Sequence, residues 1–154
     1  MSVAFRRESD EEHLEPRFEL PIPLGPNLVT ARGLALLEAR VAELEAAMPA
    51  LADEAERKAA QRDLRYWRTR LATAELTEPG SCEVVGFGCR VELKVNGKPR
   101  TIELVGHDEA DPAGGKLAFT APRCRAVMGA EVGDLVDFGG KEGSAEVVGI
   151  GIRQ

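Results

Sequence analysis

The spacing of apolar residues changes once along the chain, at about residue 77, and this change limits the folds open to it. Between residues 30 and 76, apolar side chains recur at alternating intervals of three and four, as on one face of a helix. From residue 90 onward they alternate at every second position, which is typical of strands with one buried face. A helical part followed by a strand-rich part predicts an α+β protein.

The helical part contains two apolar seams. The first consists of Leu34, Leu37, Val41, Leu44, Met48 and Leu51. The second consists of Ala60, Leu64, Trp67, Leu71 and Ala74. Two such seams joined by a short turn near Ala52 predict an antiparallel coiled-coil hairpin over residues 29–77. Arms of about 22 residues would be roughly 33 Å long at 1.5 Å per residue.

Local signals support this hairpin. Thr30 stands where the N-cap of the first helix is expected. Asp53, followed three residues later by Glu56, has the form of a capping box for the second helix. Pro49 either kinks the end of the first arm or begins the second, and the sequence leaves both options open.

Residues 1–28 differ from the rest of the chain because charges cluster in residues 6–12 and four prolines follow. Proline at this density disfavours helix and favours extended conformations. We therefore expect a poorly ordered N-terminal arm, and whether it docks on another surface stays open.

The strand-rich part, residues 78–154, is expected to form an antiparallel sheet with one short helix on a face. Residues 90–95 and 101–105 alternate strictly, and Asn96-Gly97 between them is a strong hairpin-turn signal. Further strands are expected at residues 117–120, 135–138 and 145–152, and a short helix at 123–128.

Composition and charge exclude several classes of function. The formal net charge of −6 argues against wholesale nucleic-acid binding, which needs a positive surface. The three cysteines, Cys82, Cys89 and Cys124, lack the spacing of metal ligands and are expected to be reduced thiols. No run approaches the ~20 apolar residues of a membrane span. We expect a cytoplasmic protein with no membrane contact and no small-molecule substrate.

Four motifs in order resemble one known family. Val105-Gly-His-Asp-Glu-Ala-Asp111, Thr120-Ala-Pro-Arg-Cys-Arg-Ala-Val-Met-Gly129 and Gly133-Asp-Leu-Val136 are similar to three C-terminal motifs of the GreA/GreB family of bacterial transcription elongation factors. The segment that begins at Val29-Thr-Ala-Arg-Gly resembles the start of the family's first coiled-coil helix. The resemblance covers residues 29–154.

This resemblance implies a coiled-coil hairpin followed by a C-terminal domain of FKBP-like shape. In the family, the C-terminal domain docks on RNA polymerase at the rim of the secondary channel, and the hairpin enters the channel. Two acidic residues at the hairpin tip help to hold a Mg²⁺ ion at the active site of the polymerase. With this ion in place, the polymerase hydrolyses the backtracked transcript. The protein would have no cofactor of its own and would not itself be an enzyme.

The hairpin tip departs from the family pattern. The family's acidic loop is missing, and the arms lack about two helical turns or more compared with the family, or roughly 10 Å at 1.5 Å per residue. The nearest acids are Asp53, Glu54 and Glu56. The sequence therefore predicts a short-hairpin regulator that binds RNA polymerase. The alternative is a factor that stimulates transcript cleavage with these three acids, sharing the polymerase's Mg²⁺.

Two further groups of residues are candidate contacts. The resemblance implies polymerase docking through Asp108, Glu109, Asp111, Pro122, Arg123 and Arg125. Lys58, Arg62 and Arg65 share one helix face at positions i, i+4 and i+7. This basic patch is either a solvated helix face or a surface for polymerase acids and for nascent RNA or DNA. We expect no metal site from His107 and its acidic neighbours.

Overall fold

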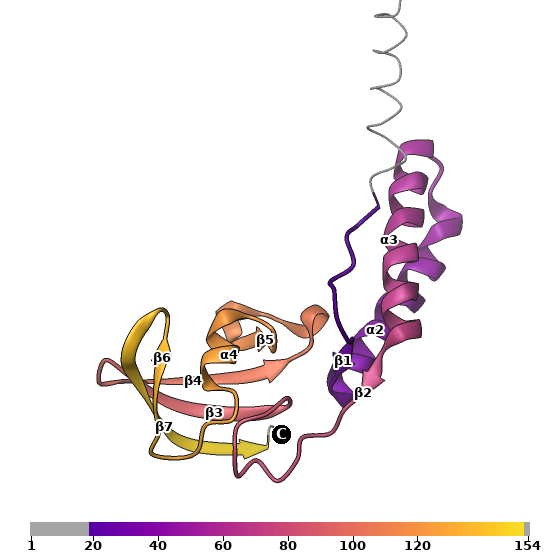
Figure 1. Ribbon diagram of the computed structural model, residues 1–154. Helices are drawn as coiled ribbons and strands as arrows, with labels where there is room; N and C mark the ends of the chain where they lie inside the picture. Colours follow the sequence, from indigo (N-terminus) through magenta and orange to yellow (C-terminus); the bar gives the residue numbers. More distant parts are fainter. Residues whose placement is uncertain (1–18, 153–154) are drawn as a thin grey trace, which may run out of the picture.

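The computed structural model describes residues 19–152. The described chain forms a helical hairpin and a strongly curled sheet, joined by an extended linker (Figure 1). This arrangement confirms the predicted α+β class, whereas the coiled-coil geometry and the FKBP-like shape remain predictions. The proline-rich arm lies mostly outside the described residues. None of the helices in residues 19–152 is both long enough and apolar enough to cross a membrane.

The hairpin consists of α2 (Ala31–Ala47), a 3₁₀ turn η1 (Met48–Ala50) and α3 (Glu54–Thr73). The two helices, of 17 and 20 residues, are about 25 and 30 Å long, somewhat shorter than expected. Pro49 lies in the first turn of η1, so it ends the first arm rather than beginning the second.

Both predicted caps are present in the hairpin. The Thr30 hydroxyl accepts a hydrogen bond from the backbone N–H of Gly33 at 2.9 Å. Asp53 Oδ2 accepts one from the N–H of Glu56 at 3.0 Å. Each bond satisfies a backbone donor that has no partner inside its helix.

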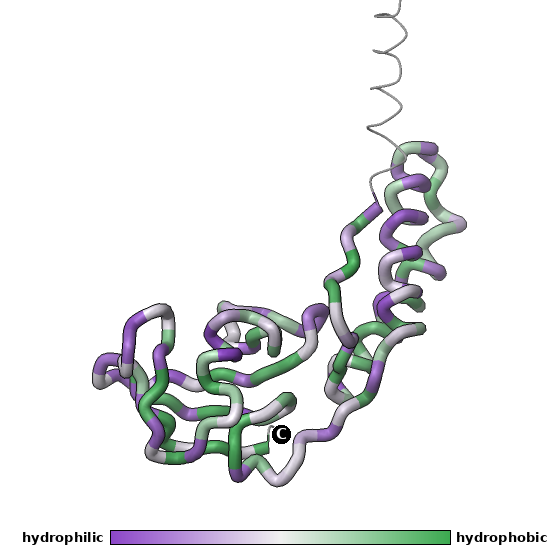
Figure 2. Tube along the Cα trace, viewed as in Figure 1, coloured by the Kyte–Doolittle hydropathy of each residue, from purple (hydrophilic) through white to green (hydrophobic). Residues whose placement is uncertain are grey.

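The seams hold the two helices together. Every seam position is at least half-buried, and Leu37 and Leu64 are 0% and 6% exposed. Apolar and polar positions alternate along both arms in Figure 2, as a two-helix rod with one shared face requires. Trp67 packs in this seam, and the Arg40 guanidinium lies 5.4 Å from its ring centre.

The base of the hairpin is closed by two short strands that the sequence did not reveal. Strand β1 (Leu28–Val29) pairs in parallel with β2 (Glu75–Leu76). The N–H of Glu75 donates to the carbonyl of Asn27 at 2.8 Å, and that of Thr77 to the carbonyl of Val29 at 2.9 Å. The structured part of the chain therefore begins before the predicted hairpin boundary.

The second part is a five-stranded sheet with the order β5-β4-β3-β7-β6. Its strands are β3 (Cys89–Val95), β4 (Lys98–Val105), β5 (Lys116–Ala118), β6 (Leu135–Phe138) and β7 (Lys141–Ile152). Helix α4 (Pro122–Val127) contributes Cys124 and Val127 to the core of the sheet, and both are 0% exposed. The turn at Asn96-Gly97 has two positive φ angles, 52° and 81°, as predicted for a two-residue hairpin.

One strand pair corrects the prediction of a purely antiparallel sheet. Strands β4 and β5 are parallel, with Leu104 opposite Leu117. The chain between them runs through two 3₁₀ turns, η2 (His107–Glu109) and η3 (Pro112–Gly114), before it enters β5. These turns carry the chain back along the sheet edge, so that it starts β5 in the direction of β4. The motif from Val105 to Asp111 belongs to this return.

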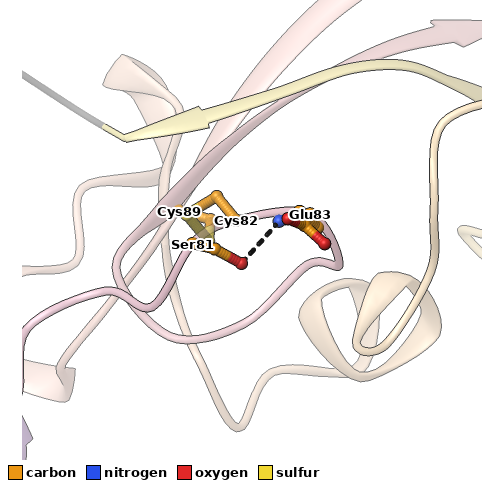
Figure 3. The surroundings of a disulfide bond; sticks show 4 residues. All are labelled: Ser81, Cys82, Glu83 and Cys89. Atoms are coloured by element: carbon orange, nitrogen blue, oxygen red, sulfur yellow. Dashed lines mark hydrogen bonds between the residues drawn. A yellow bond between two sulfur atoms is a disulfide. The ribbon is translucent and has the colours of Figure 1, made fainter.

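The prediction of three reduced thiols is wrong for two cysteines. Cys82 in the linker and Cys89 at the start of β3 form a disulfide, which Figure 3 shows with its neighbours. The glycine-containing turn between them brings their Cα atoms to 6.1 Å, within the range a disulfide spans. Cys124 is a free, fully buried thiol, as expected of a small core residue.

Replacing the cap of α3 tests the local stability of the hairpin tip. Asp53→Ala removes the acceptor for the Glu56 N–H and should lower the free energy of unfolding by about 1 kcal/mol. Asp53→Asn keeps an equivalent acceptor and should cost much less. Urea denaturation followed by the helical circular dichroism signal measures both. Equal losses in the two variants would show that the carboxylate charge, rather than the cap, stabilises this end.

Candidate functional site

A buried polar cluster joins the base of the hairpin to the sheet domain. We call Asn27, Tyr66, Arg70 and Asp108 the junction cluster. Arg70 Nε donates to Asp108 Oδ2 at 2.6 Å, and the two side chains are 2% and 8% exposed. Arg70 Nη2 also donates to Asn27 Oδ1 at 2.7 Å, while Asn27 Nδ2 donates back to the carbonyl of Arg70 at 2.8 Å. These bonds link the residue before β1 to α3 and η2.

Tyr66 completes the partners of the buried carboxylate. Its hydroxyl donates to Asp108 Oδ1 at 2.5 Å. Burial, followed by the hydrogen bond to Asp108, raises the pKa of Tyr66 to about 12, so the hydroxyl keeps its proton at neutral pH. His107 lies next to the cluster, where burial and then the charge of Arg70 lower its pKa. Its ring therefore tends to stay neutral, and Arg70 remains the cation that balances Asp108.

A second contact closes the same junction. The Thr30 hydroxyl donates to Glu109 Oε1 at 2.6 Å, and both residues are buried. A Cβ at Gly33 would lie 3.1 Å from this carboxylate oxygen, and one at Gly106 would collide with the carbonyl oxygen of Leu28. The glycines therefore allow the loop of the sheet domain to approach the hairpin backbone closely.

The junction changes the interpretation of the predicted docking residues. Asp108 and Glu109 turn towards the hairpin, where Arg70 and Thr30 bind them, and their side chains are not offered to a partner. Asp111 in the same loop is exposed. Docking through Asp111 stays a prediction, whereas the role that the geometry gives to its two neighbours is internal.

The other docking candidates lie on α4, next to a pocket. This pocket has a volume of about 530 Å³. Its lining residues are Pro112, Leu117, Ala121, Pro122, Arg123, Asp137, Gly139 and Gly140. The structure thus brings Pro122 and Arg123 together at one pocket, while Arg125 is exposed on α4 and does not line it. Its lining is largely apolar and includes one cation, Arg123, and one anion, Asp137.

Aromatic packing orients the cation of this pocket. The Arg123 guanidinium lies 5.5 Å from the ring centre of Phe138, which is itself 4% exposed. Such stacking leaves the edges of the guanidinium, which carry its N–H groups, free for hydrogen bonds. The pocket can therefore bind an apolar side chain that has a carboxylate beside it.

The tip acids do not gather into a metal site. Asp53, Glu54 and Glu56 are all exposed, but Asp53 is engaged as the cap of α3. Glu54 lies 3.9 Å from Lys58 Nζ in an i,i+4 pair. In the described part of the chain, no group of three or more His, Cys, Asp or Glu residues is placed to hold a metal ion.

The predicted basic patch is partly neutralised by acids of the same chain. Arg65 makes a bidentate pair with Glu19 of the N-terminal arm, at 2.9 and 2.7 Å. This hydrogen bonding is the main reason why the pKa of Glu19 is lowered. Arg62 lies 3.7 Å from Asp63. Lys58 and Arg65 are exposed and Arg62 is half-buried. The end of the arm that runs beside α3 pairs with Arg65, one of the three cations (Figure 1).

The junction cluster is the part of the site that sequence reasoning missed. The sequence pattern alone indicates no junction role for Arg70, Tyr66 or Asn27. One signal was present, because Arg70 follows the seam residue Trp67 by one helical turn. A cation next to a buried seam needs a nearby acid, and the loop at 108–111 is rich in acids.

The fold and site define an α+β protein in which a helical hairpin is fixed to a small sheet domain with an apolar pocket. Residues 80–152 match the family model "Transcription elongation factor, GreA/GreB, C-term". The C-terminal part of the chain is therefore similar to the C-terminal domain of the GreA/GreB family.

Individual relatives agree with this family. The chain is 36% identical over 72 residues to a transcription elongation factor GreA of Ralstonia nicotianae, covering 44% of this chain and 46% of that protein. It is 33% identical over 90 residues to a GreB of Neisseria meningitidis, covering 56% and 55%. The chain thus spans about half the length of these curated relatives.

The solved structures to which the chain is similar include a transcription elongation factor GreA/GreB from Nitrosomonas europaea. It is 20% identical to this chain with a TM-score of 0.40, and the match covers 83% of this chain and 99% of the other.

Removing the buried anion tests the junction cluster. Asp108→Ala leaves the Arg70 guanidinium buried without its charge partner and should lower the free energy of unfolding by about 3–5 kcal/mol. Asp111→Ala is a matched control, because it removes an exposed acid from the same loop and should change stability by less than about 0.5 kcal/mol. Both values come from urea titrations. Similar losses in the two variants would mean that the pair does not stabilise the junction.

Proposed function

We propose that the protein is an RNA polymerase-binding regulator of transcription elongation. Its C-terminal domain docks at the secondary channel, and its short hairpin faces the channel entrance. The observation that carries this proposal is the pocket at Pro122 and Arg123, which lies within the part of the chain that is similar to the GreA/GreB family. The names of the relatives, transcription elongation factors, support the same process.

The pocket supplies the docking contact. Leu117 and Ala121 offer apolar surface, and Arg123 offers N–H donors to a carboxylate on the polymerase. Such a site combines burial of an apolar anchor with a charge contact at its rim, as specific interfaces commonly do. The overall charge of −6 does not prevent this contact, because exposed charges more than about 10 Å away are largely screened at moderate salt.

The junction cluster fixes the orientation of the hairpin relative to the C-terminal domain. Because Arg70 and Asp108 are buried together, the hairpin does not swing freely about the linker while they remain paired. A docked C-terminal domain would then point the arms of α2 and α3, about 25 and 30 Å long, along one line. The exposed acids of the tip would lie at the end of that line.

The tip decides between regulation and stimulated cleavage. Carboxylates can share a Mg²⁺ ion with polymerase residues, and Asp53, Glu54 and Glu56 are the candidates on this chain. They do not form a ligand set of their own, and Asp53 already caps α3. We therefore assign no hydrolytic step to them. Stimulation of the polymerase's own cleavage by these acids is the second candidate function, because all three are exposed at the tip.

Charge reversal in the pocket tests docking. Arg123→Glu should weaken binding to bacterial RNA polymerase at least tenfold, a loss of about 1.4 kcal/mol. Arg125→Glu makes the same charge change on the same short helix without touching the pocket, and should alter the dissociation constant less than about threefold. Fluorescence anisotropy with labelled protein gives both constants. Equal effects would point to general electrostatic attraction instead of the pocket.

Transcript cleavage in a backtracked elongation complex separates the two functions. For a regulator, we expect no cleavage with this protein alone and dose-dependent inhibition of an authentic Gre factor. The Arg123→Glu variant should lose that inhibition. Cleavage by the protein alone, abolished by Asp53→Asn and Glu56→Gln together, would establish stimulation instead. These two substitutions remove charge while keeping the polar groups of the cap, so loss of folding is not the expected cause.

A further inference from the structure

The disulfide lies in the segment that connects the hairpin to the sheet. The segment between β2 and β3 is the covalent link between hairpin and sheet, and Cys82 lies inside it. The bond to Cys89 ties this segment to the first residue of β3 (Figure 3). While the bond is intact, residues 77–81 alone separate β2 from a covalent anchor on the sheet.

Without the disulfide, the next anchor lies further along the chain. The N–H of Val85 donates to the carbonyl of Ala130 at 2.9 Å, and the N–H of Gly129 donates to the carbonyl of Val85 at 2.9 Å. Reduction would therefore extend the tether from residues 77–81 to residues 77–84. In this extension Glu83 and Val84 are exposed, so packing of these two residues does little to hold it in place.

The backbone at Cys82 favours release. Its φ angle is 60°, in the left-handed region that residues with a Cβ rarely adopt. The disulfide helps to hold this conformation, together with the hydrogen bond from the Glu83 N–H to Ser81 Oγ at 3.3 Å. Once the sulfurs are free, residue 82 can return to a common φ angle, and segment 81–84 then leaves its present path.

We propose that Cys82 and Cys89 form a reversible thiol–disulfide exchange site whose oxidation state sets the length of the tether between hairpin and sheet. The reaction partner is a low-molecular-weight thiol and its disulfide. On oxidation, the Cys82 thiolate attacks one sulfur of the small disulfide and expels a thiolate. Cys89 then displaces the second small thiolate from Cys82. Two cysteine protons are released, the protein bond forms, and the small disulfide is reduced to two thiols.

The structure assigns the order of attack. Cys82 is 8% exposed and Cys89 is 1% exposed, so the first contact with a small molecule falls to Cys82. Cys124 takes no part, because it is fully buried and burial raises its pKa to about 11. It serves as an internal reference thiol. This inference concerns the free protein and does not depend on polymerase binding.

The first test is to equilibrate the full chain in glutathione buffers of varied redox ratio, followed by acid quench, denaturation and maleimide labelling. Intact mass should show one label per chain on the oxidising side, three on the reducing side, and a reversible transition between them. A folded protein that keeps three free thiols in oxidised glutathione would overturn the proposal. So would a protein that keeps one free thiol at every glutathione ratio.

The second test is hydrogen exchange of the tether, measured by mass spectrometry in both redox states. Reduction should speed exchange at residues 81–84 by about tenfold or more, while Val85, β3 and β4 keep their protection. The Cys82→Ser variant should exchange like the reduced protein in both buffers, so the oxidant itself is controlled for. Unchanged exchange of the tether on reduction would overturn the proposal, as would equal acceleration throughout the sheet domain.

Discussion

The arrangement of hairpin and sheet depends on the buried pair of Arg70 and Asp108. Each of these charges would be costly to bury alone, because the low-polarity interior cannot replace its hydration. Asn27 accepts a hydrogen bond from Arg70 and Tyr66 donates one to Asp108, so each charge has a second polar partner. Breaking the junction would leave these polar groups without partners in the protein or require water to enter. That penalty favours a single orientation of the hairpin.

The glycine-containing loop makes this pairing possible. Gly106 lets the end of β4 pass directly against the carbonyl oxygen of Leu28, and η2 then directs Asp108 and Glu109 into the junction. The same loop continues through η3 to β5, which forms one wall of the pocket through Leu117. Junction and pocket are therefore built on one short return of the chain. A shift of this loop at the junction would also displace the wall of the pocket.

Much of the fold could be predicted because its signals are local. The caps at Thr30 and Asp53 and the turn at Asn96-Gly97 each depend on residues within a few positions. The missed features depend on distant residues. The parallel pairings β1–β2 and β4–β5 and the Arg70–Asp108 pair join segments whose proximity only the complete fold determines. The disulfide is close in sequence, yet cysteine spacing alone did not show that the chain turns back between the two residues.

A fixed hairpin also affects how tightly a two-point contact can bind. A protein that docks through its pocket and then places a hairpin loses less conformational entropy if the hairpin already points in one direction. The effective concentration of the tip at its target is then set by geometry rather than by tether length. This arrangement limits the distance over which the tip can make contacts. A rigid hairpin with arms of 17 and 20 residues cannot compensate for missing length by changing its direction. A buried pair that would make docking efficient would therefore also make the length of the hairpin decisive for what its tip can touch.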